Sequence, residues 1–560
     1  MDGPSGTTPS WRRRLALGAG AAALVAAGIV VAVSVRGDGR SAATEAKSVV
    51  PRFVDETDAA GVDHVYDGDF DFFVGGGVAV FDCDDDGRAE LYFAGGSEPA
   101  ALYRNESPTG GALRFTRQPS SVTDLASVTG AYPLDVDSDG VVDLAILRVG
   151  SNAMLRGLGD CRFEVANELW NIDGGEAWTT AFSATWEGSN TLPTLAFGNY
   201  LAAGSDPNDI ACDDSQFVRP NATGDGFDDA LPLRPGYCTL SMLFSDWNRS
   251  GRRDLRLTND RHYYTDGEEQ LWRVPPGEAP TEYTQDDGWQ PLQIWGMGIA
   301  SRDLTGDGYP EVFITSQGDN KLQTLSDGPA MPTYRDMALR SGVTAQRPFA
   351  GGDVLASTAW HPEFADVNND GFVDLFISKG NVEAQPDYAT NDPNNLLIGA
   401  ADGTFVEGAE AAGILGFERS RGAALVDLNL DGMLDLVVVH RRENVTLWRN
   451  VGTGNDEQAA LVGNWIAVRL DQPAPNVNAI GAQLEVRLGD RTSVREVTIG
   501  GGHAGGQLGW LHTGLGDADR AELRVQWPDG ETGPWITVEA NRFVTIERGA
   551  TEATLWSPDE

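Results

Sequence analysis

The sequence predicts an all-β fold for most of this 560-residue chain. Three observations indicate it: short apolar runs with aromatic residues recur between turns, glycine is abundant at 68 residues, and no long segment of helical period follows residue 36. A hydrophobic content of 41% with 15 Trp excludes a disordered chain. The length exceeds that of one ordinary small domain, so more than one structural unit is expected.

An acidic motif, D-x-[DNST]-x-[DNS]-G-x-x-[DE], recurs between apolar runs, as in "LDVDSDGVVDLAILR". Successive copies start 53, 111, 57, 63 and 61 residues apart. The gap of 111 is about twice the others, and "FSATWEGSNTLPTLAFGNY" lies inside it as a degenerate copy. Six intact copies and one degenerate copy make seven units, each with further strand-like segments such as "NLLIGAADGTF" (395–405).

A period of about 40 to 60 residues with several short strands per unit is typical of a propeller blade. We therefore predict a seven-bladed β-propeller over residues 51–455. The seventh unit lacks its last strand, and "RFVDETDAAGV" (52–62) supplies a matching one, so an N-terminal strand should close the last blade. Alternating polar and apolar residues predict a small β-sandwich-like domain over 462–549, with Trp527 in its core, followed by a tail, 550–560.

Each acidic motif resembles the first half of a calcium loop, because residues 1, 3, 5 and 9 can converge while the glycine at position 6 permits a sharp bend. The alternative is a set of acidic β-turns, but turn geometry alone does not require the acid found at position 9 of all six copies. Calcium is preferred to magnesium, which demands tighter octahedral geometry. The first two sites, with four carboxylates each, are expected to be strongest, and the third weakest. The predicted ligands are Asp82, Asp84, Asp86, Glu90; Asp135, Asp137, Asp139, Asp143; Asp246, Asn248, Ser250, Asp254; Asp303, Thr305, Asp307, Glu311; Asp366, Asn368, Asp370, Asp374; and Asp427, Asn429, Asp431, Asp435.

The N-terminus predicts a membrane segment. Arg12, Arg13 and Arg14 precede an uncharged run, 15–35, whose length as a helix would span about 30 Å of hydrocarbon. Positive residues on that side predict a cytoplasmic tail, 1–14, and a signal-anchor followed by a linker, 36–50. The alternative is a cleaved signal peptide and a secreted protein. Either way, the body is expected to lie outside the cytoplasm.

The four cysteines fit an oxidising compartment. Four cysteines can pair in three ways. Cys212 and Cys238 flank one polar insertion, which favours their pairing and leaves Cys83 with Cys161.

Two segments resemble known families. "GVAVFDCDDDGRAELYFAGG" looks like the FG-GAP/VCBS repeat of integrin-like β-propellers, whose hairpin loops bind calcium. "NWIAVRLDQPAPNVNAIGAQLEVRLGDRTSVREVTIGGG" and "HTGLGDADRAELRVQWPDG" resemble the ASPIC/UnbV domain that follows such propellers in the cartilage acidic protein family. The chain departs from that pattern at "GGGHAGGQ" (500–507), where a Ser/Tyr-containing stretch is usual.

Composition and motifs favour a binding protein over an enzyme. The formal charge of −42 argues against nucleic-acid binding. None of the six histidines forms HExxH, and neither GxSxG nor a Walker loop occurs. His503 and His512 share a Gly-rich region and could meet. The first hypothesis is a membrane-anchored calcium-binding scaffold for an unidentified protein or glycan. The second is an accessory factor or enzyme of an exported or biosynthetic, UnbV-like pathway.

Overall fold

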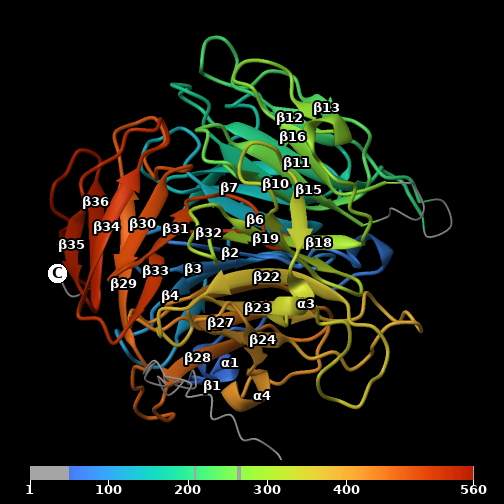
Figure 1. The fold of residues 1–560 in the computed structure, drawn as a ribbon. Helices are drawn as coiled ribbons and strands as arrows, with labels where there is room; N and C mark the ends of the chain where they lie inside the picture. Colours follow the sequence, from blue (N-terminus) through green and yellow to red (C-terminus); the bar gives the residue numbers. More distant parts are fainter. Residues whose placement is uncertain (1–48, 207–209, 261–266, 559–560) are drawn as a thin grey trace, which may run out of the picture. The chain divides into compact units, whose positions relative to one another are not determined.

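The computed structural model describes residues 49–206, 210–260 and 267–558, and these form an almost entirely β-structured body (Figure 1). The predicted all-β fold is confirmed. Within those ranges no helix has the length and apolar character needed to cross a bilayer. The predicted membrane segment, 15–35, lies outside the described residues.

Seven sheets follow one another along the chain, each built around four antiparallel strands that are consecutive except in the last; β32 (Gln507–Leu508) joins the first sheet as a fifth strand. The first three sheets comprise β2 (Val78–Phe81), β3 (Glu90–Phe93), β4 (Ala101–Asn105) and β5 (Phe115–Arg117); β6 (Val128–Leu134), β7 (Asp143–Arg148), β8 (Ala153–Gly157) and β9 (Phe163–Val165); and β10 (Trp178–Thr185), β11 (Thr194–Leu201), β12 (Ser215–Val218) and β13 (Leu231–Leu233). The fourth and fifth sheets comprise β14 (Thr239–Ser245), β15 (Asp254–Asn259), β16 (Gln270–Arg273) and β17 (Thr281–Glu282); and β18 (Gly296–Arg302), β19 (Glu311–Ser316), β20 (Lys321–Leu325) and β21 (Tyr334–Asp336). The last two comprise β22 (Ala359–Ala365), β23 (Asp374–Lys379), β24 (Asn395–Gly399) and β25 (Phe405–Glu407); and β26 (Ser420–Val426), β27 (Asp435–His440), β28 (Thr446–Gly452) and β1 (Arg52–Asp55).

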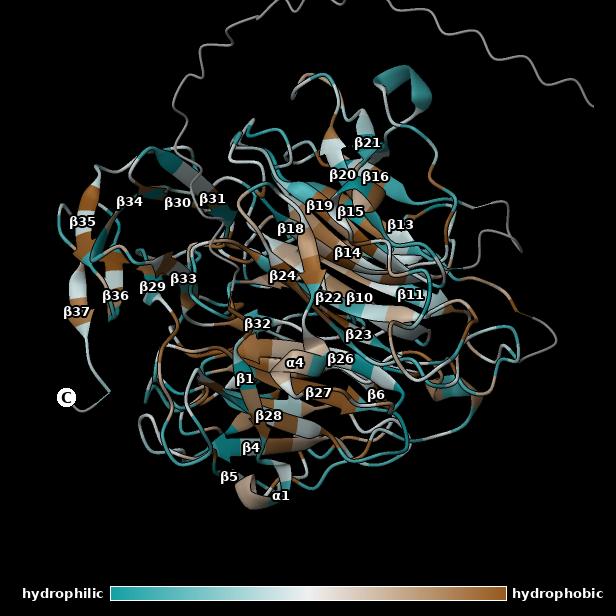
Figure 2. Cartoon of the chain, turned by 60° about the horizontal axis from the view of Figure 1, so that its bottom comes forward, coloured by the Kyte–Doolittle hydropathy of each residue, from teal (hydrophilic) through white to brown (hydrophobic). Residues whose placement is uncertain are grey.

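The first strands of the sheets contact one another in the order β2, β6, β10, β14, β18, β22 and β26, and β26 contacts β2 again. This order of contacts is propeller-like. Every residue of β6, β10 and β14 is buried, because neighbouring sheets cover both faces. The fourth strands β5 and β9 each bury only one of three residues. Figure 2 accordingly shows hydrophobic residues concentrated along the strands and mostly hydrophilic connecting loops.

The predicted N-terminal closing strand is confirmed. β1 pairs antiparallel with β28, and Phe53 is buried in the core of the last two sheets. The short helix α1 (Thr57–Ala60) follows β1, as α3 (Ala338–Ser341) and α4 (Ala409–Ala412) follow the fourth strands of two other sheets. Segment 52–62 is therefore a displaced fourth strand with its turn.

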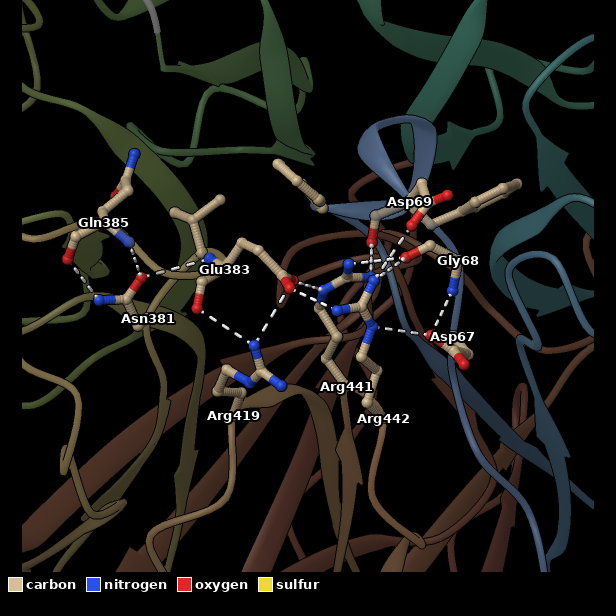
Figure 3. A network of polar contacts seen from close by, with 12 residues as sticks. Asp67, Gly68, Asp69, Asn381, Glu383, Gln385, Arg419, Arg441 and Arg442 are labelled. Atoms are coloured by element: carbon tan, nitrogen blue, oxygen red, sulfur yellow. Dashed lines mark hydrogen bonds and ion pairs between the residues drawn. The ribbon is translucent and has the colours of Figure 1, made fainter. Parts of the chain in front are cut away.

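A polar network reinforces this closure (Figure 3). Arg441 and Arg442, just after β27, bind the carbonyl of Gly68, and Arg442 also pairs with Asp67 at 3.0 Å. Glu383, between β23 and β24, accepts from Arg441 Nε at 2.7 Å. The sixth and seventh sheets are thus tied to the segment between α1 and the 3₁₀ turn η1 (Phe70–Phe72), which leads to the first sheet. A second 3₁₀ turn, η2 (Gln285–Asp287), follows β17.

Both predicted disulfides are formed, Cys83–Cys161 and Cys212–Cys238. Cys83 lies between β2 and β3, whereas Cys161 lies between β8 and β9, so the first bond joins the first two sheets. The second bond joins the β11–β12 connection to the segment before β14.

We call the seven sheets above the ring. Two further four-stranded sheets form the C-terminal domain, within the same compact unit as the ring (Ser48–Glu560). One contains β29 (Asn464–Asp471), β33 (Leu511–Gly516), β36 (Arg542–Glu547) and β37 (Thr554–Trp556), and the other contains β30 (Gln483–Leu488), β31 (Arg491–Glu496), β34 (Arg520–Gln526) and β35 (Ile536–Glu539). Strand β37 extends into the segment predicted as a tail. Trp527 is 3% exposed in the core of this domain, as predicted. That core is continuous with apolar residues of the second and third sheets.

Candidate metal loops and the surface they face

The six acidic motifs occupy one equivalent position: each is the hairpin between the first and second strands of its sheet. We number them loop 1 to loop 6 in chain order, with bounds 82–90, 135–143, 246–254, 303–311, 366–374 and 427–435. The degenerate copy joins β10 to β11 in the third sheet. There Glu187 pairs with Arg219 at 2.7 Å and accepts a hydrogen bond from Thr194, so protein partners already satisfy its carboxylate.

A shared hydrogen-bond pattern folds every loop. The Asp at position 1 accepts the N–H of the glycine at position 6, at 2.7–3.2 Å throughout. All six glycines have φ between +83° and +87°, which L side chains rarely adopt. Position 4 is also left-handed in every loop, including Leu430 with φ +58°. The motif therefore contains two left-handed positions, of which only the glycine was evident from the sequence.

The acid at position 9 has a structural role besides the predicted one. In loop 6, Asp435 accepts the N–H of Leu428 at 2.9 Å and that of Asn450 in β28 at 2.8 Å. Asp143 and Asp374 make the equivalent pair of contacts in loops 2 and 5. Position 9 thus fastens the hairpin to the third strand, which gives a second reason for its acidic identity.

The ligand oxygens converge most clearly in the first two loops. One carboxylate oxygen from each of Asp82, Asp84 and Asp86 lies within 4.8 Å of the others, and the same holds for Asp135, Asp137 and Asp143. Burial and then the neighbouring carboxylates raise the pKa of Asp82 to about 6. Burial and like charges raise the pKa of Asp135 to about 6 as well, because a charged form without a counter-ion is disfavoured there.

Some buried side-chain oxygens of the loops have no hydrogen-bond partner. Within the described part of the chain, six buried oxygens of the loops make no hydrogen bond: Asp82 Oδ1, Asp84 Oδ2, Asp137 Oδ1, Asn369 Oδ1, Asn429 Oδ1 and Asp431 Oδ2. Asp84 Oδ2 forms an ion pair with Arg104, and two of the other five belong to loop 6. Burying such acceptors without a partner costs free energy, so they are suited to a cation.

Arginines compete for the acids of the first three loops. Arg104 of β4 pairs with Asp84, and Arg156 of β8 pairs with Asp137 at 2.7 Å and Asp139 at 2.6 Å. In loop 3, Arg252 pairs with Asp254 at 2.8 Å. Among the described residues, no such ion pair reaches the predicted ligands of loops 5 and 6.

The loops face the C-terminal domain. Trp510 Nε1 donates to the carbonyl of Gly87 in loop 1 at 3.1 Å, and His512 Nε2 lies 3.1 Å from the carbonyl of Gly432 in loop 6. Arg249 of loop 3 pairs with Glu485 at 2.9 Å. Loops 2 and 5 make further hydrogen bonds to residues 476 and 516. These five loops therefore hydrogen-bond to this domain, and Asp303 of loop 4 has a further backbone contact with Val494 of β31.

The segment 499–508 of the C-terminal domain enters the centre of the ring. Its backbone hydrogen-bonds to β10 at Ala184, to β14 at Met242, to β18 at Ile299 and to β6 at Ala131. Strand β32 (Gln507–Leu508) pairs in parallel with β2. Gly501 and Gly502 have φ of +73° and +56°, which permits this winding path.

His503 and His512 make different contacts. His503 accompanies the central segment, where its N–H donates to His361 Nδ1 at 3.1 Å and its ring packs on Trp360. His512 instead stacks on Trp465 within the domain. Burial lowers the pKa of His503 to about 3 and that of His512 to about 4, so both are neutral at physiological pH.

Comparison with known proteins identifies the two kinds of module. The family model of the FG-GAP-like repeat matches residues 82–146 and 303–377, and that of ASPIC and UnbV matches 472–553. The resemblance drawn from the sequence is confirmed: the chain combines FG-GAP-like repeats with an ASPIC and UnbV domain.

The curated relatives include Cartilage acidic protein 1. The mouse protein is 30% identical over 158 residues, 25% of this chain and 21% of its own length. The human protein is 28% identical over 158 residues, 25% of this chain and 20% of its own length. The match thus spans about a fifth of these relatives.

Solved structures that match this chain include the complex of BBS1N with ARL6DN soaked with mercury, at 10% identity and a TM-score of 0.41 over 73% of this chain and 100% of that one. A lectin of Agrocybe aegerita that recognises non-reducing terminal N-acetylglucosamine matches at 15% identity and 0.40, over 68% of this chain and 92% of that one.

Proposed function

We propose that this chain is an extracytoplasmic calcium-binding scaffold that presents one face of a closed seven-bladed β-propeller to a protein or glycan. The observation that carries the calcium role is the set of buried, unpartnered oxygens inside equivalent acidic hairpins, above all Asn429 Oδ1 and Asp431 Oδ2. Calcium takes six to eight hard oxygen ligands in flexible geometry, which suits these loops better than octahedral magnesium.

The neighbouring arginines suggest an order of affinity different from a count of carboxylates. Loops 1 and 2 hold four acids each, but Arg104 and Arg156 already neutralise part of that charge. Loop 6 keeps two open oxygens, and the arginine of its third strand, Arg449, pairs with Glu56 at 2.8 Å rather than with an acid of the loop. We therefore rank loop 6 first, and loop 3, with Arg252 on its position-9 acid, last.

Calcium in these loops would act on the docking of the C-terminal domain. The backbone of loops 1, 5 and 6 carries the hydrogen bonds to that domain, and a bound dication fixes the conformation of the loop that supplies them. Calcium binding would then stabilise the docked state by mass action. The stabilisation is about 2.7 kcal/mol for each site when the free calcium concentration is 100 times the Kd of that site.

The face opposite the loops is proposed for the partner, since the C-terminal domain covers the loop face. The connections that precede the first strands of the sixth and seventh sheets lie at that opposite end. They expose apolar side chains: Leu339 is 84% exposed, Val354 71% and Phe417 40%. Contiguous apolar patches mark interaction surfaces, and we take these three side chains as parts of one such surface.

Localisation outside the cytoplasm is part of the proposal. Two formed disulfides support an oxidising compartment. We assign the run 15–35 as a single-pass anchor, with cleavage and secretion as the alternative. The second functional class, an accessory factor or enzyme of a biosynthetic pathway, rests on the ASPIC and UnbV match alone.

Calcium titration followed by calorimetry and thermal melting tests the metal role. Asp431→Asn keeps the acceptor for Met433 N–H at 3.0 Å and alters only the unpartnered oxygen. The variant should melt like the wild type in EDTA and lose one calcium-binding event. Asp435→Asn should instead have a lower Tm even in EDTA, because one buried N–H loses its acceptor. The expected loss in the free energy of unfolding is about 1–3 kcal/mol.

The matched control is Asp85→Asn, which removes an equal charge at position 4 of loop 1, where the side chain is 97% exposed. It should leave calcium binding unchanged. A wild-type melting curve that is identical in calcium and in EDTA would remove the metal from the proposal.

A further inference from the structure

A cavity of about 560 Å³ lies between the centre of the ring and the C-terminal domain. Strands β18, β22 and β26 line one side, and β31 with the central segment 499–508 lines the other. Such a volume falls in the range of small-molecule sites. His361 lines it as well. Its charged lining comprises three arginines and several acids: Arg302, Arg469 and Arg495, with Asp82, Asp84, Asp85, Asp160, Glu363, Asp427 and Glu496.

Two of these arginines have no acid partner. Within the described ranges, neither Arg302 nor Arg495 lies within 4 Å of a carboxylate oxygen, and Arg302 Nε is buried without a hydrogen-bond partner. The only hydrogen bond of the Arg495 guanidinium there is a long one, 3.4 Å, to the carbonyl of His512. Two guanidiniums without an ion pair within 4 Å therefore line one cavity, and Glu363 of the same lining acts on Arg495 only from beyond that distance.

Glu363 and Glu496 of the same lining are committed to other donors. Glu363 accepts from Gln507 Nε2 at 2.8 Å and from the backbone N–H of Leu425 at 3.0 Å. Glu496 accepts from Ser245 Oγ at 2.8 Å and from the N–H of Asp246 at 3.0 Å. Both carboxylates are thus held by donors from β26, the central segment and the β14 hairpin rather than by the arginines.

His361 adds a further donor. Its Nδ1 accepts the N–H of His503, so the neutral ring carries its hydrogen on Nε2. Nε2 is buried without a hydrogen-bond partner among the described residues and lies 3.5 Å from Glu363. The cavity accordingly offers the two guanidiniums and one imidazole N–H at the same end.

Apolar side chains also line the cavity. Apolar side chains of the strands and the domain complete the wall, including Ile299, Phe364, Leu425 and Trp510. The same lining includes acids of loops 1 and 6, Asp82, Asp84 and Asp427. Like charge would keep a bound anion away from these carboxylates and direct it to the guanidiniums.

We propose that this cavity binds a small organic anion, with its carboxylate or phosphate head at Arg302 and Arg495 and its apolar body against Ile299 and Leu425. Unpaired buried cations are costly, and a carboxylate or phosphate matches the guanidinium fork. An apolar body would replace water along the remaining wall.

Calorimetric titration of the purified full-length chain with octanoate and octyl phosphate tests this proposal, with 1-octanol and octyltrimethylammonium as neutral and cationic probes of equal chain length. At least one anion should bind at least tenfold more tightly than either of those probes. Arg302→Met and Arg495→Met should each weaken anion binding at least tenfold, with little effect on octanol. Arg520→Met, on an arginine whose side chain is 67% exposed, is the matched control and should change nothing.

Arg302→Lys keeps a cation but not the planar fork, so its loss of anion affinity should be intermediate. This variant replaces Arg302→Met in the test if the methionine variant does not fold. The proposal is overturned if neither anion binds the wild type, if octanol binds as tightly, or if the Arg520 variant loses as much as the cavity variants.

Discussion

Gly432 and Gly140 form a matched pair that measures how strongly the loops hold the C-terminal domain. Both occupy position 6 of their loops, with φ of +84° and +87°. A Cβ added to Gly432 would lie 1.8 Å from Cε2 of Trp465, whereas a Cβ at Gly140 would meet nothing within 4 Å. The backbone cost of Gly→Ala is therefore the same at both positions, about 1–2 kcal/mol, and only Gly432→Ala also disturbs the domain contact.

The additional cost can be worked from the packing of Trp465. Its side chain is 5% exposed and contacts Phe543 at a ring-centroid distance of 4.8 Å, so it cannot yield without moving other buried groups. Overpacking of this kind costs about 1–3 kcal/mol. Gly432→Ala should therefore destabilise the chain by about 2–5 kcal/mol and Gly140→Ala by about 1–2 kcal/mol.

Denaturant unfolding and hydrogen exchange distinguish the two variants. Exchange in 464–471 and 511–516 should accelerate in Gly432→Ala and stay at the wild-type rate in Gly140→Ala. Equal stabilities and equal exchange in the two variants would refute the claim that loop 6 supports the domain.

Three other perturbations test separate parts of the structure. Burial and like charge raise the pKa of Asp82 and Asp135 to about 6, so these groups stabilise the metal-free fold at low pH, and this contribution is lost as the pH rises through 6. The difference in Tm between calcium and EDTA should therefore be larger at pH 8 than at pH 5. Equal differences at the two pH values would contradict this prediction. Phe53→Ala should cost about 3–5 kcal/mol by denaturant unfolding, because Phe53 carries the closing strand into the core; a loss below 1 kcal/mol would mean that β1 contributes little. Replacing Cys212 and Cys238 by serine should cost about 2–4 kcal/mol, measured in the same way, and an unchanged midpoint would assign the bond no role in stability.

The repeats made most of the ring predictable. Each unit carries its own hairpin motif, so the seven sheets could be located from spacing alone, and the missing fourth strand of the last unit pointed to 52–62. The degenerate copy could also be placed, because the apolar runs around it, such as β11, are kept although the ligands are lost. Periodic local signals of this kind survive in a single sequence.

Contacts between distant segments could not be predicted. The entry of 499–508 into the ring depends on backbone hydrogen bonds to several sheets, and glycine-rich sequence specifies no partner for them. The left-handed residue at position 4 was equally hidden, since Asp85, Arg249 and Leu430 share no side-chain property. Both features are imposed by tertiary structure, which tolerates about 1 kcal/mol of local backbone cost at such a position.

Identical motifs in different surroundings should not bind identically. Position 9 is acidic in every loop because it fastens the hairpin to the third strand, so an acid there does not by itself indicate a bound ion. The more selective signal is whether the arginine of the third strand reaches position 5: Arg156 of β8 lies 2.6 Å from Asp139, whereas Arg449, at the equivalent point of β28, donates to Glu56 at 2.8 Å and leaves Asp431 with a buried free oxygen. An arginine that reaches position 5 supplies the positive charge that calcium would otherwise bring. The number of occupied loops should therefore be smaller than six, and it should rise in Arg156→Met, where the acids of loop 2 lose their only cationic partner among the described residues.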